Sequence, residues 1–493
     1  MFLRTVIQLT VVSVTLAGCS AVEPTGDAAT PESPTAPNIV LIIADDLGWG
    51  EVGYNGSHIK TPAIDALAGE GLVFDRFYAY PTCSQTRAAL LTGRRAGKLG
   101  LYEPITPWSK AGIPADTPTL AELMQSQGYA TWLVGKWHLG HHTLDRFPHR
   151  RGYDYAYGNL GGEVGYYTHA MVGQLDWQRN GQIVEEEGHT TDLLTQDAIR
   201  LLRSHDSEQP YFLTLSYNAP HTPLQPKPGY SEPYAALQDE RSRMIAGLVA
   251  HLDDSIGLVI QAVAERPDAD NTLVLFMSDN GAPVMFGGNN GRLKGSKMST
   301  YEGGVRVPAI AWWPGRLNPG ILASPVSVFD LFPTLASLSG AAMPADDYNR
   351  PGADIWPALA DGAPIQRQQP IGFEILLMGF LYYSVYDGDW KLVAGKTGLP
   401  RQFTPEQITD LSYELYNVAA DPSERDNLAS SEPDQLTKMR KLMDSVDFGP
   451  PKRLEPPPRD WTGPMAPTPL GDRMPITRPN VVEAAEQNER ESN

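Results

Sequence analysis

The chain has 493 residues, of which 41% are hydrophobic, enough for the core of one large domain with an appendage or of two domains. Its net charge of −19 argues against nucleic acid or an anionic membrane surface as a bulk partner. If the substrate is anionic, the positive charges that bind it must be local. Only two cysteines are present, Cys19 and Cys83.

Residues 1–19 predict an export signal. Positive charge at the amino terminus precedes an apolar run that is too short to cross a bilayer. The segment Leu16-Ala17-Gly18-Cys19 resembles a bacterial lipobox, which implies a lipid anchor on Cys19, and Ser20 favours the outer membrane. Ordinary signal cleavage is the alternative. Residues 20–36, rich in Pro, Thr and Ala, predict a flexible tether, so we expect a periplasmic or cell-surface lipoprotein.

Four apolar runs have the length and β-branched content of buried parallel strands: residues 39–44, 130–134, 211–217 and 272–277. Helical patterns lie between them. Thr61 and Pro62 open one that Gly71 ends, and Pro118 opens another that Gly128 ends. The alternation predicts an α/β fold with a mainly parallel sheet between helices.

Polar side chains follow each predicted strand. In open α/β sheets, ligands bind beyond the carboxyl ends of the strands. We therefore expect one edge of the sheet to gather Asp45, Asp46, Lys136, His138, His221, Asp279 and Asn280.

Oxygen donors dominate this predicted edge. Asp45, Asp46, Asp279 and the Asn280 carbonyl suit calcium or magnesium, whereas the nearby histidines keep zinc open. Any single motif could be a helix cap or a turn. Four such motifs at one edge favour a metal site.

Cys83 stands in "YPTCSQTRAALLTGR", where residues 87–93 predict a short helix with a glycine stop. Backbone N–H groups at such a helix start favour negative charge, and Arg87 can point back to the same pocket. With Cys19 lipidated, Cys83 has no disulfide partner in an oxidising compartment. The position suits an activated nucleophile facing an anionic substrate, although a buried small residue is the simpler alternative.

These motifs resemble the type I sulfatases of the alkaline phosphatase superfamily. Their signature, Cys-x-Pro-x-Arg followed by Leu-Thr-Gly, stands here as Cys83-Ser84-Gln85-Thr86-Arg87 and residues 91–93. The resemblance runs from about Asn38 to Leu335 and includes "ADDLGWGEVGYNG", "VGKWHLG", "SDNG" and "KMSTYEGGVRVPA". Linking segments such as "APHTPLQ" look most like arylsulfatase B, the N-acetylgalactosamine-4-sulfatase. The resemblance implies an alkaline-phosphatase-like fold.

The resemblance also implies roles for single residues. A maturing enzyme would oxidise Cys83 to formylglycine, which would bind Ca²⁺, rather than Mg²⁺, together with Asp45, Asp46, Asp279 and Asn280. Arg87, Lys136 and His138 would steady the formylglycine, with His138 as a base. Lys136, His221 and Lys297 would bind the sulfate. His221 is the expected general acid, with Lys297 as its rival, and spacing to "YEGG" favours Lys297 over Lys294.

The implied reaction is hydrolysis of O-sulfate esters on a sulfated oligo- or polysaccharide. Gln85 departs from the signature proline, a position that the maturation machinery reads. One alternative is therefore a silent glycan-binding lipoprotein with unconverted Cys83, and another is a phosphonate or phosphodiester hydrolase of the same superfamily. His169 is expected to bind substrate, and the other candidate walls of a sugar pocket are Tyr166, Tyr167, His141 and His142.

The pattern changes after the predicted catalytic domain, residues 37–370. Residues 371–448 predict a small antiparallel sheet with a helix over residues 428–446, as in the C-terminal subdomain of sulfatases. The proline-rich tail, residues 449–493, is not expected to fold alone and would either wrap along the surface or stay disordered.

Overall fold

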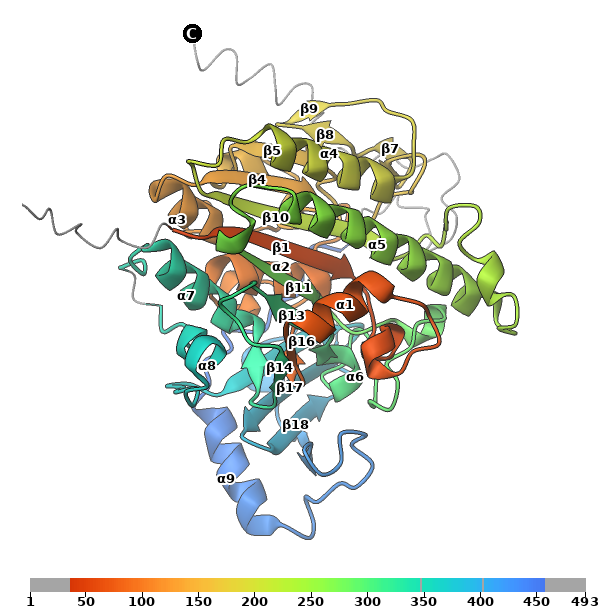
Figure 1. Cartoon of the computed structure of the whole chain (residues 1–493). Helices are drawn as coiled ribbons and strands as arrows, with labels where there is room; N and C mark the ends of the chain where they lie inside the picture. Colours follow the sequence, from red (N-terminus) through yellow and green to blue (C-terminus); the bar gives the residue numbers. More distant parts are fainter. Residues whose placement is uncertain (1–35, 346–347, 401–402, 457–493) are drawn as a thin grey trace, which may run out of the picture. The chain divides into compact units, whose positions relative to one another are not determined.

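The computed structural model describes residues 36–345, 348–400 and 403–456. The predicted signal peptide, its lipid-anchor cysteine and the tail beyond residue 456 lie outside the described residues. One large sheet forms the centre (Figure 1), with strand order β14-β2-β13-β11-β1-β10-β4-β5-β8-β9. Its strands are β1 (Asn38–Asp45), β2 (Leu72–Phe74), β4 (Ala130–Gly135), β5 (Tyr155–Gly158), β8 (Gln178–Arg179), β9 (Gln182–Ile183), β10 (Tyr211–Pro220), β11 (Thr272–Ser278), β13 (Ala309–Trp312) and β14 (Gly320–Leu322).

The middle of this sheet is parallel, as the sequence predicted. β1 pairs in parallel with both β10 and β11, β10 with β4, and β4 with β5. Antiparallel pairing occurs only towards the two edges, for example where β11 meets β13. All four apolar runs are therefore parallel strands, and the polar residues that follow them meet at one edge.

Helices cover both faces of the sheet (Figure 1). Ile39, Leu41 and Ile43 of β1 pack into one core with α2, α3 and α7, whereas the alternate residues Val40 and Ile42 pack with α1, α4 and α5. The helices are α1 (Pro62–Glu70), α2 (Cys83–Thr92), α3 (Leu120–Ser126), α4 (Thr190–Ser204), α5 (Glu240–Ala264), α6 (Glu302–Val305), α7 (Val328–Ser339), α8 (Trp356–Asp361) and α9 (Pro433–Asp444).

Two predicted helix starts shift in the structure. α2 begins at Cys83 itself rather than near Arg87, so Cys83 occupies the first turn. α3 begins after Thr119, whose hydroxyl accepts the Glu122 amide N–H in a capping box, and Pro118 lies outside the helix. Helix α1 begins at Pro62 as predicted.

Helix α5 is long and apolar enough to cross a membrane by length and composition. However, 61% of its apolar stretch is buried inside the protein. It contacts α4, α1 and β10, which is the setting of a core helix in an α/β fold.

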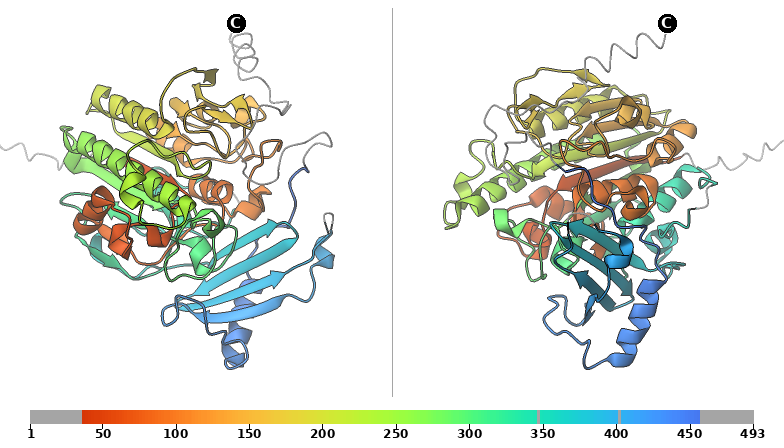
Figure 2. Two further views of the ribbon diagram at one scale, coloured as in Figure 1. Left: turned by 90° about the vertical axis from the view of Figure 1, so that its right-hand side faces the viewer. Right: turned by 180° about the vertical axis from the view of Figure 1, so that it is seen from behind.

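A second sheet follows the large one in the chain (Figure 2). It is antiparallel, with order β16-β17-β18-β19, and α9 packs on β17 and β18. This confirms the predicted C-terminal subdomain, with the helix shorter than expected. Smaller sheets join β12-β3-β15 and β6-β7. The bounds of these strands are β16 (Ile371–Leu377), β17 (Phe380–Asp387), β18 (Trp390–Lys396), β19 (Ser412–Asn417), β3 (Phe77–Tyr78), β12 (Arg306–Val307), β15 (Val326–Ser327), β6 (Ala170–Met171) and β7 (Gln174–Leu175).

Candidate functional site

Two buried ion pairs lie at the carboxyl edge of the parallel strands. The Lys136 Nζ, just after β4, donates to Asp45 Oδ2 at the end of β1 over 2.6 Å. Arg87 of α2 donates through Nε (3.0 Å) and Nη2 (2.8 Å) to Asp279 Oδ2, just after β11. All four side chains are buried. The strand order thus joins residues that are far apart in the sequence.

Asp46 connects this edge to the loops that carry Lys297 and His221. Lys297 Nζ lies 2.7 Å from Asp46 Oδ1 and 2.8 Å from Oδ2, and His221 Nε2 lies 3.5 Å from Oδ2. Asn280 Nδ2 donates to Asp46 Oδ1 over 2.6 Å. Asp46 has a φ of 71°, a left-handed conformation that is uncommon for a residue other than glycine. The backbone is held there by the Asp46 N–H, which donates to Asp279 Oδ1 over 3.2 Å.

Two oxygens of this cluster have no hydrogen-bond donor. Asp45 Oδ1 and Asn280 Oδ1 are buried and without a partner among the described residues. Ligand atoms of Asp45, Cys83 and Asp279 lie within 4.8 Å of one another, and so do those of Asp45, Asp46 and His221. Unpaired buried oxygens are costly, and a hard cation would satisfy them. The donor set therefore fits a divalent cation.

Cys83 is a buried free thiol beside this donor set. Burial raises its pKa, so the unmodified thiol stays protonated and is a poor nucleophile at neutral pH. His138 approaches the next residue: its Nε2 lies 3.1 Å from Ser84 Oγ and donates to the Ile105 carbonyl over 2.8 Å. Burial, reinforced by Lys136, lowers the pKa of His138 well below its usual value, so His138 is neutral.

Burial and neighbouring charge also shift the pKa values of His221, Asp279 and Asp46. Burial lowers the pKa of His221 to about 4, and Lys297 acts in the same direction. Burial raises the pKa of Asp279 to about 6, with a further contribution from Asp45. Burial opposes ionisation of Asp46 too, but Lys297 and His221 outweigh it and hold that pKa at about 2.

The structure separates the two lysines that competed in the sequence. Lys297 reaches Asp46, whereas Lys294 donates to Tyr416 Oη over 2.9 Å and pairs with Glu414 Oε2 at 3.4 Å, both on β19. Lys297 is thus the lysine at the cluster, as predicted.

The predicted sugar-pocket residues are scattered. The His169 ring stacks on Trp177 with centroids 4.8 Å apart, and its Nε2 donates to the Gly188 carbonyl over 3.0 Å. These are packing contacts, so a substrate-binding role for His169 gains no support from them. His141 is buried with Nε2 on the Pro107 carbonyl (3.1 Å), His142 is half-buried, and Tyr167 is 45% exposed.

Two residues to which the sequence analysis gave no role, Ser84 and Ser216, and one that it expected in a pocket wall, Tyr166, hold the site in place. Ser84 Oγ accepts the Ile105 N–H (3.0 Å), Ser216 Oγ accepts Arg87 Nη1 (2.5 Å), and Tyr166 Oη donates to the Asn218 (3.0 Å) and His221 (2.9 Å) carbonyls. Tyr166 was expected in a pocket wall, but its hydroxyl instead fixes the backbone of His221. Ser216 lies near the end of a predicted strand, five residues before His221. This position was the one sequence signal that could have placed it at the site.

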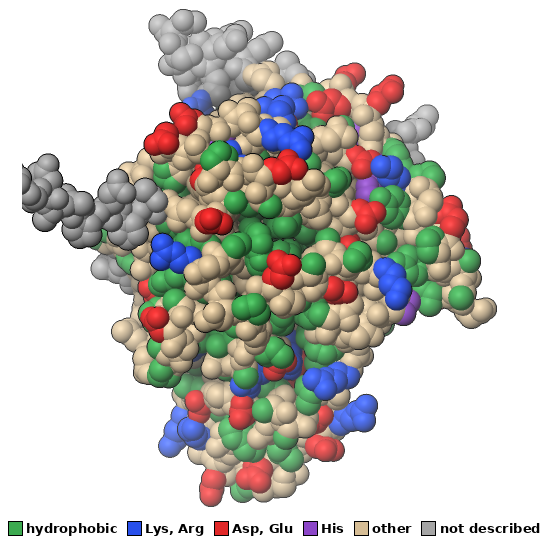
Figure 3. Space-filling model, in the orientation of Figure 1, with side chains coloured by type: hydrophobic (Ala, Val, Ile, Leu, Met, Phe, Trp, Pro, Cys, Tyr) green, Lys and Arg blue, Asp and Glu red, His purple; other side chains and the backbone are tan. Residues whose placement is uncertain are grey.

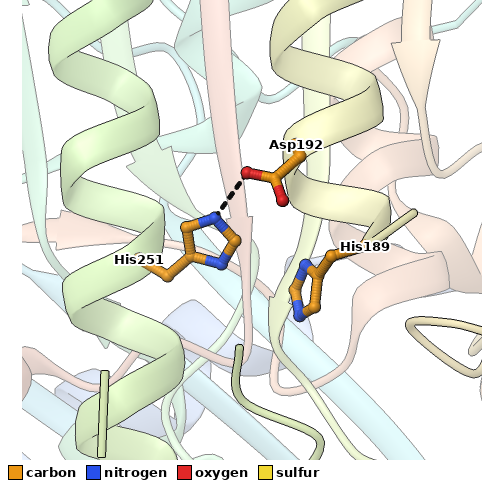
Figure 4. Close-up of side chains that lie close together, drawn as sticks. All are labelled: His189, Asp192 and His251. Atoms are coloured by element: carbon orange, nitrogen blue, oxygen red, sulfur yellow. Dashed lines mark hydrogen bonds and ion pairs between the residues drawn. The ribbon is translucent and has the colours of Figure 1, made fainter. Parts of the chain in front are cut away.

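A second polar cluster braces the loop after His221 (Figure 4). His251 Nε2 donates to Asp192 Oδ1 over 2.9 Å, and Lys227 pairs with the same carboxylate at 2.9 Å. His189 Nε2 donates to the Gln225 carbonyl over 3.1 Å. These contacts fasten the segment four to six residues beyond His221 to the start of α4, and they join α4 to α5.

Fold and site together define an α/β protein whose mainly parallel sheet carries buried carboxylate–cation pairs beside a free cysteine at its carboxyl edge. The sulfatase family model matches residues 37–341. Arylsulfatase J of Mus musculus is 31% identical over 459 residues, which cover 84% of this chain and 77% of the relative. N-acetylgalactosamine-6-sulfatase of Mus musculus is 34% identical over 441 residues, covering 80% and 82%.

The same likeness holds for solved structures. The crystal structure of Ps i-CgsB in complex with k-i-k-neocarrahexaose is 34% identical, with a TM-score of 0.75 and coverage of 83% of this chain and 92% of that one. The chain belongs to the sulfatase family, with its alkaline-phosphatase-like fold, and is a sulfatase. The likeness is not specific to arylsulfatase B, because these similar relatives are other sulfatases.

Proposed function

We propose that this sulfatase removes O-sulfate from a sulfated carbohydrate, using a formylglycine made from Cys83 and one Ca²⁺ ion. The observation that supports this most is the pair of unpartnered buried oxygens, on Asp45 and Asn280, beside Cys83. Relatives named as N-acetylgalactosamine-6-sulfatase and the Ps i-CgsB complex with an oligosaccharide make a carbohydrate the preferred substrate class.

The residues that would hold Ca²⁺ are Asp45, Asp46, Asp279, Asn280 and the modified Cys83. Their oxygen atoms suit a hard cation better than zinc, which prefers nitrogen and sulfur. When bound, the cation would activate an oxygen nucleophile and offset negative charge on the sulfate. The three carboxylates already face three cations, Lys136, Lys297 and Arg87, so a divalent cation would make the cluster positive overall. That charge suits a sulfate ester.

The remaining roles follow from position and charge. Lys136, Lys297 and His221 would contact the sulfate oxygens and offset the charge that develops there. His221 would donate a proton to the leaving oxygen, because a bound sulfate raises its pKa from about 4. Lys297 is the weaker acid, since Asp46 outweighs burial and raises its pKa. Neutral His138 would accept a proton near residue 83.

Maturation requires that Gln85 be tolerated. Its buried side chain is well accommodated: Nε2 donates to the Glu374 carbonyl over 2.9 Å, and Oε1 accepts the Thr82 hydroxyl over 2.5 Å. A formylglycine would supply a hydrated aldehyde with two hydroxyls, where a protonated thiol supplies none. We therefore include a sulfatase-maturing enzyme among the proposed partners.

We also propose that the protein is an outer-membrane lipoprotein anchored through Cys19. This rests on the lipobox-like segment alone. Mass spectrometry of the mature amino terminus would show diacylated or triacylated Cys19, and an unmodified terminus would remove the proposal.

The enzyme test compares the native-host protein with Cys83→Ser on sulfated oligosaccharides and on aryl phosphonates. Sulfate release that is lost after removal of divalent cations and restored by Ca²⁺ is expected. Turnover of phosphonates at a comparable or higher rate would favour the alternative hydrolase. Tight binding of sulfated sugars without release would favour the silent binding protein.

A further inference from the structure

A basic cavity lies between the loop of residues 99–114 and the segment 451–456. Its volume is about 720 Å³, and four cationic side chains line it against a single acidic one: Lys110, Arg146, Lys452 and Arg453 against Glu455. This excess is notable in a chain of net charge −19. On the face in Figure 3, for contrast, acidic and basic side chains are interspersed.

Hydrogen bonds join residues 102–109 to Gly449 and Glu455 on the two sides of this cavity. Trp108 Nε1 donates to the Glu455 carbonyl over 2.9 Å, and Ser109 Oγ donates to Glu455 Oε2 over 2.8 Å. Tyr102 Oη donates to the Gly449 carbonyl over 2.8 Å. Glu455 is thereby bonded to the loop, and the four cationic side chains line the cavity.

Two donors in the cavity wall are unsatisfied. Arg146 Nε and Arg453 Nε are buried and have no hydrogen-bond partner among the described residues. Arg453 Nη1 lies 4.0 Å from Glu103 Oε1. Besides burial, Lys110 and Arg146 lower the pKa of nearby His142, as expected for a positive local potential. An anion bound in this positive cavity would accept hydrogen bonds from these guanidinium donors.

One loop joins this cavity to the catalytic cluster. At one end, Ile105 accepts from His138 and donates to Ser84. At the other end, Lys110 and Gly112 line the cavity, and the Ile113 N–H donates to the Leu139 carbonyl, next to His138. Five residues of extended chain span at most about 17 Å, so a short oligosaccharide can reach from one to the other.

We propose that the cavity is a second anion subsite, which binds a sulfate or carboxylate group of a polyanionic saccharide while another sulfate ester lies at Cys83. This rests on the proposed function and adds that the substrate carries several charges. The subsite contributes to binding of long polyanions and leaves the turnover of a small monosulfated ester unaffected, because such an ester cannot reach both places.

The direct test is binding of fluorescein-labelled, low-mass dextran sulfate to the full-length protein, followed by fluorescence anisotropy. The variant Lys452→Glu/Arg453→Glu is compared with Lys438→Glu/Lys441→Glu on α9, which changes the net charge equally. We expect about tenfold weaker binding for the cavity variant and a change below about twofold for the control. Equal losses, or no binding to the wild type, would overturn the subsite.

Failure of the subsite can be told apart from failure of the proposed function. Turnover of a small aryl sulfate tests the catalytic cluster alone, and we expect the cavity variant to match the wild type there. This match also shows that the variant folds. Neutral dextran serves as the charge control, and binding of it as tight as that of dextran sulfate would contradict an anion subsite.

Discussion

Two buried charge clusters in this protein differ in how completely their atoms are satisfied. At the carboxyl edge of the large sheet, Asp45 Oδ1 and Asn280 Oδ1 have no partner among the described residues. Next to the C-terminal subdomain, both oxygens of Glu302 are used: Oε1 accepts from Tyr386 and Lys391 (both 3.0 Å) and Oε2 from Tyr78 (3.1 Å). The first cluster leaves these two oxygens for a ligand, whereas protein donors satisfy Glu302, and Glu424 Oε1 in the same cluster pairs with Lys391 at 2.8 Å.

Left-handed backbone occurs at both clusters, since Glu424, the partner of Lys391, has a φ of 48°. Asp46, His138 and Met298, which border the catalytic cluster or its lysine, have φ values of 71°, 57° and 73°. Tyr78 and Lys391 lie on regular strands. Left-handed backbone at non-glycine residues costs free energy and persists where the surroundings enforce it, as is common at functional sites.

The largest expected effect is at the incomplete cluster. Asp279→Asn removes a carboxylate that faces both Arg87 and the proposed cation. We expect sulfate release to fall below detection and bound Ca²⁺, measured by inductively coupled plasma mass spectrometry, to fall with it. Full activity with normal calcium content would contradict the assignment of the metal site.

Lysine substitutions sharpen the comparison within one loop. Lys297→Ala should lower kcat/KM by about 10²–10³-fold, because it removes a cation that would face the sulfate. Lys294→Ala is the matched control, since its ammonium contacts β19, and we expect a change below about threefold. The reverse order would show that the wrong lysine was assigned.

Substitutions in the Glu302 cluster should lower the stability of the fold rather than the activity. Lys391→Met leaves the buried Glu302 and Glu424 carboxylates without their 3.0 and 2.8 Å partner. We expect a loss of about 3–5 kcal/mol in the free energy of unfolding, from denaturant titration, with kcat unchanged in the folded fraction. A lost kcat at full stability would mean that this cluster belongs to catalysis.

Glu374, on β16, gives a pH-dependent effect that is small per pH unit. Burial raises its pKa to about 8 from an ordinary 4.5, so the folded protein holds a proton that the unfolded chain releases. Its contribution is complete below pH 4.5 and is lost as the pH rises through 8. Stability should fall by about 1 kcal/mol per pH unit across that window, and Glu374→Gln should flatten the profile. If the wild type and Glu374→Gln show the same dependence of stability on pH, Glu374 is not the group responsible.

Much of the carboxyl edge of the large sheet could be predicted because buried parallel strands appear in the sequence as continuous apolar runs. The runs that became β1, β4, β10 and β11 fixed which polar residues meet, since their carboxyl ends share one edge. Lys297 needed the family resemblance, because its glycine-rich loop has no periodicity.

Other features depend on contacts that no local pattern reveals. The segment 451–456 reads as a proline-rich tail, yet in the structure it closes the basic cavity through bonds to Trp108 and Ser109. His169 has the chemistry of a sugar ligand, and the sequence does not show that its ring stacks on Trp177. Tyr166 contributes through its hydroxyl to a distant backbone rather than through a pocket wall.

The most direct test of the central claim is mass spectrometry of the tryptic peptide Phe77–Arg87, from protein made in its native host. The account predicts an aldehyde in place of the Cys83 thiol, captured by a hydrazide probe. An intact, alkylatable thiol throughout the sample would contradict it. A buried protonated cysteine cannot supply the oxygen nucleophile that we propose.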